Sequence, residues 1–301
     1  MTATATPRTD RLMTLMGARR GESEPGHTDY SQELGPRFHD HRGRTILGSI
    51  GVLVDAVPGG AAGRSVPAGT QTVLSQITAT LAAPLPEHGL VRAHGQVAHL
   101  DLESGIGLSD GDVSGPDGRT FAVLASRSVV VTRGATHAES VFSGEPLPVP
   151  DPEPVSASAE IVERSGLDVV GALASGTVAR GPLAGLLGVE LRAAERGRVV
   201  GEFAPRDWMA NYVGSIQGGI LISAADLLTG LAAQSLTDPG QDYRALDLKI
   251  DFVRSPALDG GPIRVEADVV RAGRRLALVD TRTVDATGAL LARTSASVQL
   301  L

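Results

Sequence analysis

The sequence predicts an α+β fold made of two similar units, each of which packs one long apolar helix against an antiparallel sheet. Three observations support this prediction. A long apolar segment contains a single charge, strand-like segments of alternating hydrophobicity surround it, and the pattern recurs 171 residues earlier. Of the 301 residues, 42% are hydrophobic, which is enough apolar material for the cores of two units.

The most informative segment runs from Asn211 to Asp226 and reads NYVGSIQGGILISAAD. After Gly218 and Gly219, nearly every residue up to Ala233 is apolar, which is typical of a helix covered on most sides by a sheet. Asp226 is the only charged residue of this helix. A buried carboxylate needs hydrogen bonds, a partner charge or a raised pKa. Asp226 is therefore either a functional group or a cap on nearby backbone.

The paired glycines lie at the start of the helix, where unpaired N–H groups and the positive end of the helix dipole can hold an oxyanion. Asp226 lies about 10 Å along the helix from Gly219, because the rise is about 1.5 Å per residue. It therefore cannot act at the mouth of its own helix. We expect a second helix, running in the opposite direction, to bring another carboxylate to this mouth.

The first half of the chain contains a matching segment. Residues 48–55 (GSIGVLVD) match residues 219–226 (GILISAAD) at an offset of 171, so that Asp55 is the equivalent of Asp226. Further matches, at offsets of 169 to 172, include Gly35-Pro36-Arg37 with Ala204-Pro205-Arg206. This constant register predicts a tandem repeat.

The predicted organisation has four parts. They are residues 1–30, a polar tail or a short amphipathic helix around Leu12–Met16; residues 31–134, the first and degenerate repeat; residues 135–159, a proline-rich linker; and residues 160–301, the second repeat. The linker contains PLPVPDPEP from Pro146 to Pro154, which indicates an extended connector.

Strand-like and helical segments alternate along both repeats. We expect strands at residues 72–81, 91–102, 121–131, 189–192, 198–203, 245–253, 263–271, 276–284 and 290–300, and helices at residues 48–56 and 160–174. Gly, Asp and Pro residues between Ser109 and Gly118 predict a turn. Pro58 is expected to end or kink the helix that contains Asp55.

Composition excludes several classes of function. The formal net charge is −7 and no basic patch is interleaved with aromatic residues, which argues against nucleic-acid binding. The absence of cysteine rules out disulfides and thiolate nucleophiles, and the seven histidines lack the spacing of metal ligands, so no metal or cofactor is expected. The N-terminus lacks an apolar signal region and no segment reaches membrane-spanning length, so we expect a cytoplasmic protein without membrane association.

Several motifs of the second half carry a family resemblance. They are Asn211-x-x-Gly214-x-x-Gln217-Gly218-Gly219, then Asp226, then LDLKIDFVRSP at residues 246–256 and VRAGRRL at residues 270–276. Together they resemble hotdog-fold thioesterases of the phenylacetate-pathway (PaaI-like) group. The resemblance is good over residues 180–301 and faint over the first half, and it implies two fused hotdog domains.

Two departures from the family pattern concern the mouth of the helix. The family usually has His before the two glycines, where this chain has Gln217. The first repeat has Ile46 and Leu47 where Gln217 and Gly218 would fall.

In this family two hotdog units pair edge to edge, and the carboxylate of one unit faces the helix mouth of the other. The resemblance therefore implies two non-equivalent sites. One combines Asp55 with Asn211, Gln217, Gly218 and Gly219, and the other combines Asp226 with Ile46, Leu47 and Gly48. We expect the first site to be catalytic, because its mouth is complete and oxyanion stabilisation is commonly the largest catalytic effect.

The resemblance implies hydrolysis of an acyl-CoA thioester. Gly219 N–H would bind the carbonyl oxygen, the opposing aspartate would act as general base or nucleophile, and Asn211 and Gln217 would position the reactants. Two further groups have alternative roles. Arg271, Arg274 and Arg275 could pair with the phosphates of coenzyme A or form a solvated turn, and Ser223 could hold the aspartate or bond its own helix.

Two other functions compete with this hypothesis. A hotdog hydratase would need a histidine beside the carboxylate, and the helix segments contain none. A non-catalytic acyl-CoA-binding or assembly protein is favoured by Gln217 and by the altered mouth at Ile46 and Leu47. In either case coenzyme A enters only as part of a ligand, and the resemblance implies a homo-oligomer, a dimer of double hotdogs. The sequence does not identify the acyl group.

Overall fold

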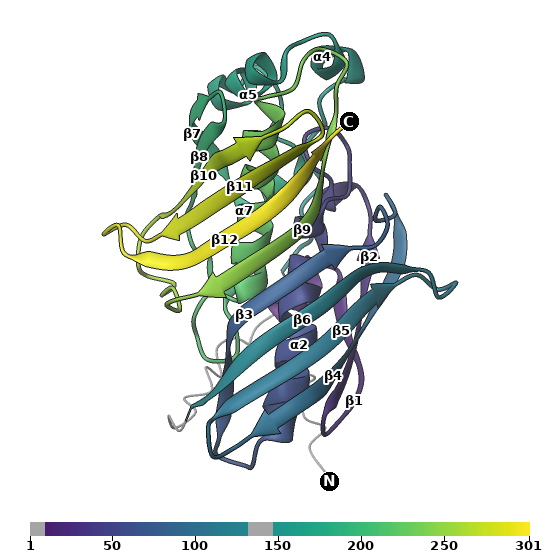
Figure 1. Cartoon of the computed structure of the whole chain (residues 1–301), viewed down its shortest axis with the longest axis vertical. Coiled ribbons are helices and arrows are strands. Elements are labelled where there is room, and N and C mark those ends of the chain that lie inside the picture. Colours follow the sequence, from purple (N-terminus) through teal and green to yellow (C-terminus); the bar gives the residue numbers. More distant parts are fainter. Residues whose placement is uncertain (1–9, 132–146) are drawn as a thin grey trace.

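The computed structural model describes residues 10–131 and 147–301, and its main feature is one antiparallel sheet of twelve strands (Figure 1). The strand order is β1-β2-β4-β5-β6-β3-β9-β12-β11-β10-β8-β7. The first half of the chain contributes β1 (Ala18–Glu24), β2 (His27–Leu34), β3 (Gln71–Leu81), β4 (Gly89–Asp101), β5 (Ile106–Ser114) and β6 (Thr120–Val131). The second half contributes β7 (Glu190–Glu195), β8 (Arg198–Phe203), β9 (Tyr243–Phe252), β10 (Ile263–Ala272), β11 (Leu276–Val284) and β12 (Leu290–Leu300). The order of the last six strands reverses that of the first six, so two equivalent units share one sheet.

Strands β3 and β9 join the two units, and their register reproduces the offset found in the sequence. At the centre, Thr78 pairs with Lys249, and 249 minus 78 is 171. The flanking pairs are Gln76 with Asp251 and Thr80 with Asp247. At the offset of 171, Gln76 is equivalent to Asp247 and Thr80 to Asp251, so exchanging the two units turns one pair into the other. The two units are therefore related by a pseudo-two-fold axis at this pair, which supports the predicted tandem repeat.

Each half of the sheet curves around one long helix (Figure 1). Helix α2 (Gly51–Ser65) belongs to the first unit and α7 (Gly218–Gln234) to the second. Apart from Gly218, every residue of α7 is buried, as its apolar composition predicts. One long helix wrapped by an antiparallel sheet, present twice, is the double hotdog arrangement, and the predicted fold class is confirmed.

The first turns of α2 and α7 contact each other directly. Ser223 Oγ donates to the carbonyl oxygen of Gly48 at 2.6 Å and lies 2.9 Å from the carbonyl oxygen of Gly219. A Cβ atom at Gly51 would clash with Ser223 Oγ and would lie 2.6 Å from the Gly219 carbonyl oxygen. A residue without a side chain is therefore required where the helices cross.

Shorter elements connect these parts. They are α1 (Arg11–Leu15), α4 (Ser158–Val162), α5 (Gly166–Ser175), α6 (Pro182–Leu187) and the 3-10 turns η1 (Pro36–Phe38), η2 (Leu47–Ile50) and η3 (Asp207–Met209). The helix expected at residues 160–174 is thus divided into α4 and α5. Residues 147–157 of the expected linker contain no helix or strand, and residues 135–146 lie outside the described residues. No helix in the described parts of the chain is both long and apolar enough to cross a bilayer.

Of the two alternatives for residues 1–30, the short amphipathic helix around Leu12–Met16 is confirmed by α1, in which Leu12 and Leu15 are buried, whereas a polar tail is wrong where β1 and β2 form. Strand β1 lies at the sheet edge with all but its first residue exposed, so its polar sequence ARRGESE carries no alternating pattern. In β2 the buried side chains include Thr28 and Gln32. Thr28 Oγ1 donates to the Val57 carbonyl oxygen at 2.7 Å and Gln32 Nε2 to the Ser49 carbonyl oxygen at 2.9 Å. A hydrophobicity pattern does not reveal buried polar residues of this kind, which hydrogen-bond α2 and the η2 turn before it.

The turn expected between Ser109 and Gly118 is also wrong over residues 109–114, which belong to β5. Gly111 of β5 pairs with Gly95 of β4, and a Cβ atom on Gly95 would lie 2.6 Å from a Val57 methyl group. These glycines do not form a turn. They allow α2 to pack closely against the sheet.

Pro58 does not end α2, which continues to Ser65. The proline is buried in the helix, and strands β2 to β6 contact α2 along its length. Tertiary packing therefore offsets the hydrogen bond that the proline removes.

We predict that Gly51→Ala destabilises the protein by about 1–3 kcal/mol, because the added methyl group overlaps Ser223 at the helix crossing. Gly63→Ala is the matched control, since Gly63 is exposed on the same helix and its Cβ would lie 3.5 Å from Thr72 Oγ1. We expect the control to be neutral or to stabilise by up to about 1 kcal/mol. Urea unfolding of both variants measures the difference, and equal effects would contradict this account of the crossing.

Candidate active site

Each long helix carries one aspartate, and each aspartate lies beside the N-terminus of the other helix. Asp55 of α2 contacts Gln217 at the start of α7, and Asp226 of α7 contacts Gly48 in η2, just before α2. We call these two arrangements the Asp55 pairing and the Asp226 pairing. The structure therefore brings the residues together in the two crossed combinations that the resemblance implies, with Asn211 set apart in its own loop.

The Asp55 pairing is centred on the side-chain amide of Gln217, which is 5% exposed. Its Nε2 donates to Asp55 Oδ2 at 2.6 Å, and its Oε1 accepts the Gly219 N–H at 2.8 Å. Burial raises the pKa of the half-buried Asp55 carboxyl to about 7. A Cβ atom on Gly218 would touch Asp55 Oδ1 and lie 2.9 Å from the Phe252 ring, so aspartate and phenyl ring both crowd this mouth. The amide of Gln217 thus bonds one oxygen of the carboxylate and one N–H group of the helix N-terminus.

Asn211 shapes the loop before α7 instead of reaching toward Asp55. Its Oδ1 accepts the N–H groups of Val213 at 3.0 Å and Ser215 at 3.1 Å, and its Nδ2 donates to Ser215 Oγ at 2.9 Å. The equivalent residue of the first unit, Asp40, accepts two backbone N–H groups in the same pattern, from Arg42 at 2.8 Å and from Arg44 at 3.0 Å. The conserved geometry of the two loops supports a structural role for Asn211.

The Asp226 pairing is a direct contact between carboxylate and backbone. Asp226 is 2% exposed, and its Oδ2 accepts the Gly48 N–H at 2.7 Å. Its other oxygen, Oδ1, has no hydrogen-bond partner among the described residues. Burial raises the pKa of Asp226 to about 6, against the lowering effect of the Gly48 hydrogen bond. Asp226 is therefore a buried base with one oxygen held by the backbone and one oxygen without a partner in the described parts of the chain.

Ser223 fixes the backbone that carries this N–H group. Its hydroxyl donates to the Gly48 carbonyl oxygen, one helical turn before Asp226, and forms no recorded contact with the carboxylate itself. Of the two alternatives for Ser223, the bond to its own helix is confirmed by the contact with the Gly219 carbonyl oxygen at 2.9 Å, and its contact with Gly48 positions that residue relative to Asp226.

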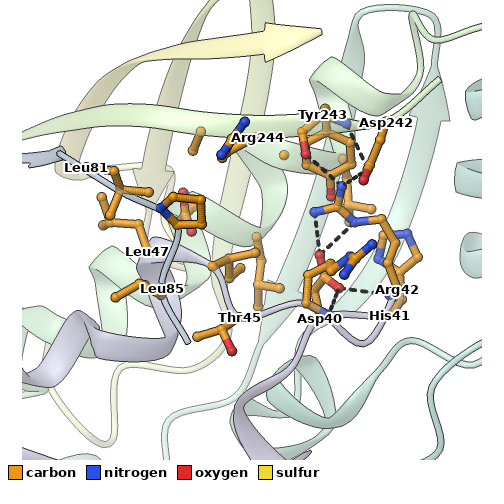
Figure 2. Close-up of a pocket in the computed structure, with 18 of the residues that line it drawn as sticks. Asp40, His41, Arg42, Thr45, Leu47, Leu81, Leu85, Asp242, Tyr243 and Arg244 are labelled. Carbon is orange, nitrogen blue, oxygen red and sulfur yellow. Dashed lines mark hydrogen bonds and ion pairs between the residues drawn. The ribbon is translucent and has the colours of Figure 1, made fainter. Parts of the chain in front are cut away.

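A cavity of about 270 Å³ lies beside the Asp226 pairing, and Asp226 forms part of its wall. The lining has an apolar side and a charged side, on the left and right of Figure 2. The apolar side includes Leu47, Leu81 and Leu85, and the charged side includes Asp40, Arg42, Asp242 and Tyr243. Arg44 and Arg244 also border the cavity. Such an amphipathic cavity suits a ligand with one apolar and one polar end.

Arg42 organises the charged wall and was not identified from the sequence. Its Nε and Nη2 donate to Asp40 Oδ2 at 2.8 and 2.6 Å, and its Nη1 donates to the Tyr243 carbonyl oxygen at 2.9 Å and to Asp242. Its guanidinium lies 3.5 Å from the centre of the Tyr243 ring. The only sequence signal is Asp40-x-Arg42 beside the first mouth, where the second unit has Val213 in place of the arginine.

The three exposed arginines of the β10–β11 turn lie at the cavity end of the sheet. Arg275 accepts the Leu300 N–H through its carbonyl oxygen, and Gln299, next to Leu300, pairs with Arg244 of β9. Phe252, at the opposite end of β9, marks the Asp55 pairing. Arg271, Arg274 and Arg275 are therefore placed toward the Asp226 pairing and away from Asp55. Within residues 10–131 and 147–301, no three acidic or histidine side chains converge to hold a metal ion.

Comparison with known proteins establishes the family. Residues 213–292 match the model of the thioesterase superfamily. A Saccharolobus solfataricus protein, provisionally named an esterase, is 33% identical over 115 residues, which cover 38% of this chain and 80% of that protein. The chain belongs to the thioesterase superfamily. This superfamily member is thus related to proteins described as esterases and thioesterases.

Solved structures match this superfamily member along its whole length. The tesB protein of Mycobacterium avium subspecies paratuberculosis has a TM-score of 0.63 at 14% identity and covers 98% of this chain and 100% of its own. A hot dog fold protein of unknown function from Alicyclobacillus acidocaldarius has a TM-score of 0.62 at 12% identity, covering 97% and 98%. At these identities the likeness shows the fold alone. The Escherichia coli PaaI protein covers 46% of the chain at 22% identity and a TM-score of 0.41, so the PaaI-like assignment stays a prediction.

The raised pKa of Asp226 predicts that stability falls as pH rises. A carboxyl with a pKa of about 6 in the folded state and an ordinary value when unfolded stabilises the fold only while protonated, so this contribution is lost as pH rises through about 6. Asp226→Asn removes the ionisation, so its stability relative to the wild type should increase by up to about 3 kcal/mol between pH 4 and pH 8. Urea unfolding at both pH values measures this. Asp110→Asn, exposed on β5, is the control, and an Asp226→Asn difference that does not change with pH would contradict the prediction.

Proposed function

We propose that this protein hydrolyses acyl-CoA thioesters, with Asp226 as general base or nucleophile and the Gly48 N–H as oxyanion donor. One observation carries the proposal: a buried carboxylate with a raised pKa contacts a backbone N–H at the start of a helical segment, in the wall of a cavity with an apolar side. These are the elements that acyl transfer requires: a base, an oxyanion donor and a pocket for the acyl group.

The reaction depends on the Gly48 N–H, which Asp226 accepts in the free protein and the substrate accepts when bound. The thioester carbonyl oxygen takes the Gly48 N–H in place of Asp226. Because this N–H lowers the pKa of Asp226, its transfer to the substrate makes the carboxylate more basic. Asp226 then removes a proton from water as the water oxygen attacks the carbonyl carbon. The C–S bond breaks, coenzyme A leaves as the thiolate and takes the proton back from Asp226, and the free acid remains. Direct attack by Asp226 gives a mixed anhydride that water hydrolyses to the same products.

The positive groups at this end of the sheet suit the anionic part of coenzyme A. Arg44 and Arg244 border the cavity, and strand β12 lies between Arg244 of β9 and the β10–β11 turn with Arg271, Arg274 and Arg275. Guanidinium groups bind phosphates bidentately, which supports a path for the phosphates across this edge. A dimer of two such chains, as the resemblance implies, belongs to the same proposal.

The Asp55 pairing is the second candidate centre, and its pKa of about 7 would suit a general base at neutral pH. The sequence-based preference for Asp55, with Asn211, Gln217, Gly218 and Gly219, therefore stays a prediction. The Gln217 side-chain amide already bonds Asp55 and the Gly219 N–H, and the Phe252 ring lies over Gly218. Both observations favour the Asp226 pairing.

A non-catalytic acyl-CoA-binding role is the alternative from another class. Leu47 occupies the position of Gly218, and Ile46 that of Gln217, so the mouth beside Asp226 has one polar donor where the other has several. Such a mouth could bind a thioester without accelerating its hydrolysis.

The first test compares thiol release from short, medium, long and aromatic acyl-CoAs by the wild type, Asp226→Asn and Asp55→Asn. We expect Asp226→Asn to lower kcat at least about 100-fold, as loss of a general base does. Asp55→Asn should retain activity of the same order as the wild type. In the wild type, kcat/KM should rise with pH through about 6, because the ionised carboxylate is the active form.

Circular dichroism and unfolding of both variants serve as the control for folding. Loss of activity only in Asp55→Asn would move the centre to the Asp55 pairing. Thermal stabilisation of the wild type by acyl-CoA without thiol release would support the binding protein.

A further inference from the structure

A second cavity, of about 290 Å³, lies apart from both aspartate pairings. It is formed where α1, η1, η3, α6 and the segment after residue 146 meet. Its apolar lining includes Leu15, Pro148, Pro152, Pro182, Leu186 and Trp208. We call it the proline cavity. The indole of Trp208, 7% exposed, and the proline rings give it flat apolar surfaces.

Two arginines from equivalent positions of the two units border this cavity. Arg37 follows Pro36 in η1 and Arg206 follows Pro205 just before η3, which are the positions matched in the sequence. The tandem repeat thus contributes one arginine from each unit to the lining of one cavity.

Neither arginine has a counter-charge within residues 10–131 and 147–301. The Arg37 guanidinium stacks on the Phe38 ring at 4.6 Å from its centre, and Arg206 Nη1 reaches only the Leu186 carbonyl oxygen at 3.5 Å. Burial lowers the pKa of Arg37 because no anion opposes it. Arg37 is half-buried, so its lack of a counter-charge is costly and an anionic ligand would remove that cost, whereas Arg206 is exposed and offers a second donor at the cavity.

The acidic residues of the cavity restrict how much negative charge it can accept. Both carboxylate oxygens of Glu153 accept from Arg180, at 2.7 and 2.9 Å, so Glu153 does not neutralise the other two arginines. Asp151 is exposed and borders the same cavity. Within the described residues Asp151 forms no ion pair, so the two arginines are opposed by one carboxylate, which favours a ligand with a single negative charge.

We propose that the proline cavity is a binding site for an aromatic monocarboxylate, whose carboxylate pairs with Arg37 and Arg206 while its ring packs on Trp208 and the prolines. A planar carboxylate matches the forked donors of arginine, and a flat ring matches the apolar walls. The site goes beyond the proposed hydrolysis and does not depend on it.

Trp208 is the only tryptophan of the chain, so its fluorescence reports directly on this cavity. Titration of the full-length protein with benzoate should change the fluorescence saturably. Arg37→Gln and Arg206→Gln should each weaken binding at least about tenfold, the loss expected for one charge-assisted hydrogen bond. Arg164→Gln, at an exposed arginine away from the cavity, and Asp226→Asn should bind benzoate as the wild type does.

Three further ligands define the class. Benzamide, which lacks the charge, and cyclohexanecarboxylate, which lacks the flat ring, should bind more weakly than benzoate. Stronger binding of phenyl phosphate than of benzoate would overturn the assignment of a monocarboxylate. Absence of a saturable change in the wild type, or equal affinity in all arginine variants, would overturn the site. Arg37→Lys, which keeps the charge, should retain part of the affinity and separates loss of binding from loss of folding.

Discussion

The contact between the first turns of α2 and α7 determines where the chemistry of this protein lies. Gly51 and Ser223 allow the two helices to cross at the distance of a backbone contact. Each helix then carries its aspartate seven residues beyond the glycine of its own mouth, which places the carboxylate at the mouth of the other helix. The pairing of β3 with β9 joins the two halves of the sheet, and so fixes the two helices relative to each other. The two pairings are therefore consequences of one packing constraint.

The same backbone arrangement supports two different chemical environments. At one mouth, the amide of Gln217 stands between carboxylate and helix, and every polar atom of that amide is used. At the other, an isoleucine replaces the glutamine, and Asp226 contacts the Gly48 N–H directly. The glutamine side chain thus stands between carboxylate and helix at the first mouth, whereas at the second the carboxylate accepts the backbone N–H itself.

Much of the fold was predictable from the sequence because its signals are local. The apolar run of α7, the period-two pattern of strands such as β10 and the offset of 171 are all readable along the chain. The failures have a common cause in long-range packing. Thr28 and Gln32 are buried because they bond the α2 segment, Gly95 and Gly111 are small because α2 approaches them, and Pro58 is tolerated because strands surround it.

The crossed pairings were predictable from the repeat and the resemblance, whereas the cavity was not. The cavity depends on Arg42, whose partners Asp242 and Tyr243 lie about two hundred residues away in the chain. No local pattern connects them. The charged wall exists only because the first unit's loop packs against the start of β9.

Fusion of two units in one chain explains how such an asymmetry can persist. Two identical subunits would carry the same residue at positions 46 and 217, so both mouths would be closed by glutamine or both opened by isoleucine. A tandem chain is free of that constraint. Burial raises the pKa of both aspartates, to about 7 at Asp55 and to about 6 at Asp226, so both arrangements cost stability when the carboxylate is ionised. Asp226, however, contacts a backbone N–H directly in the wall of a cavity with an apolar side, and this is the physical reason to seek the chemistry at Asp226.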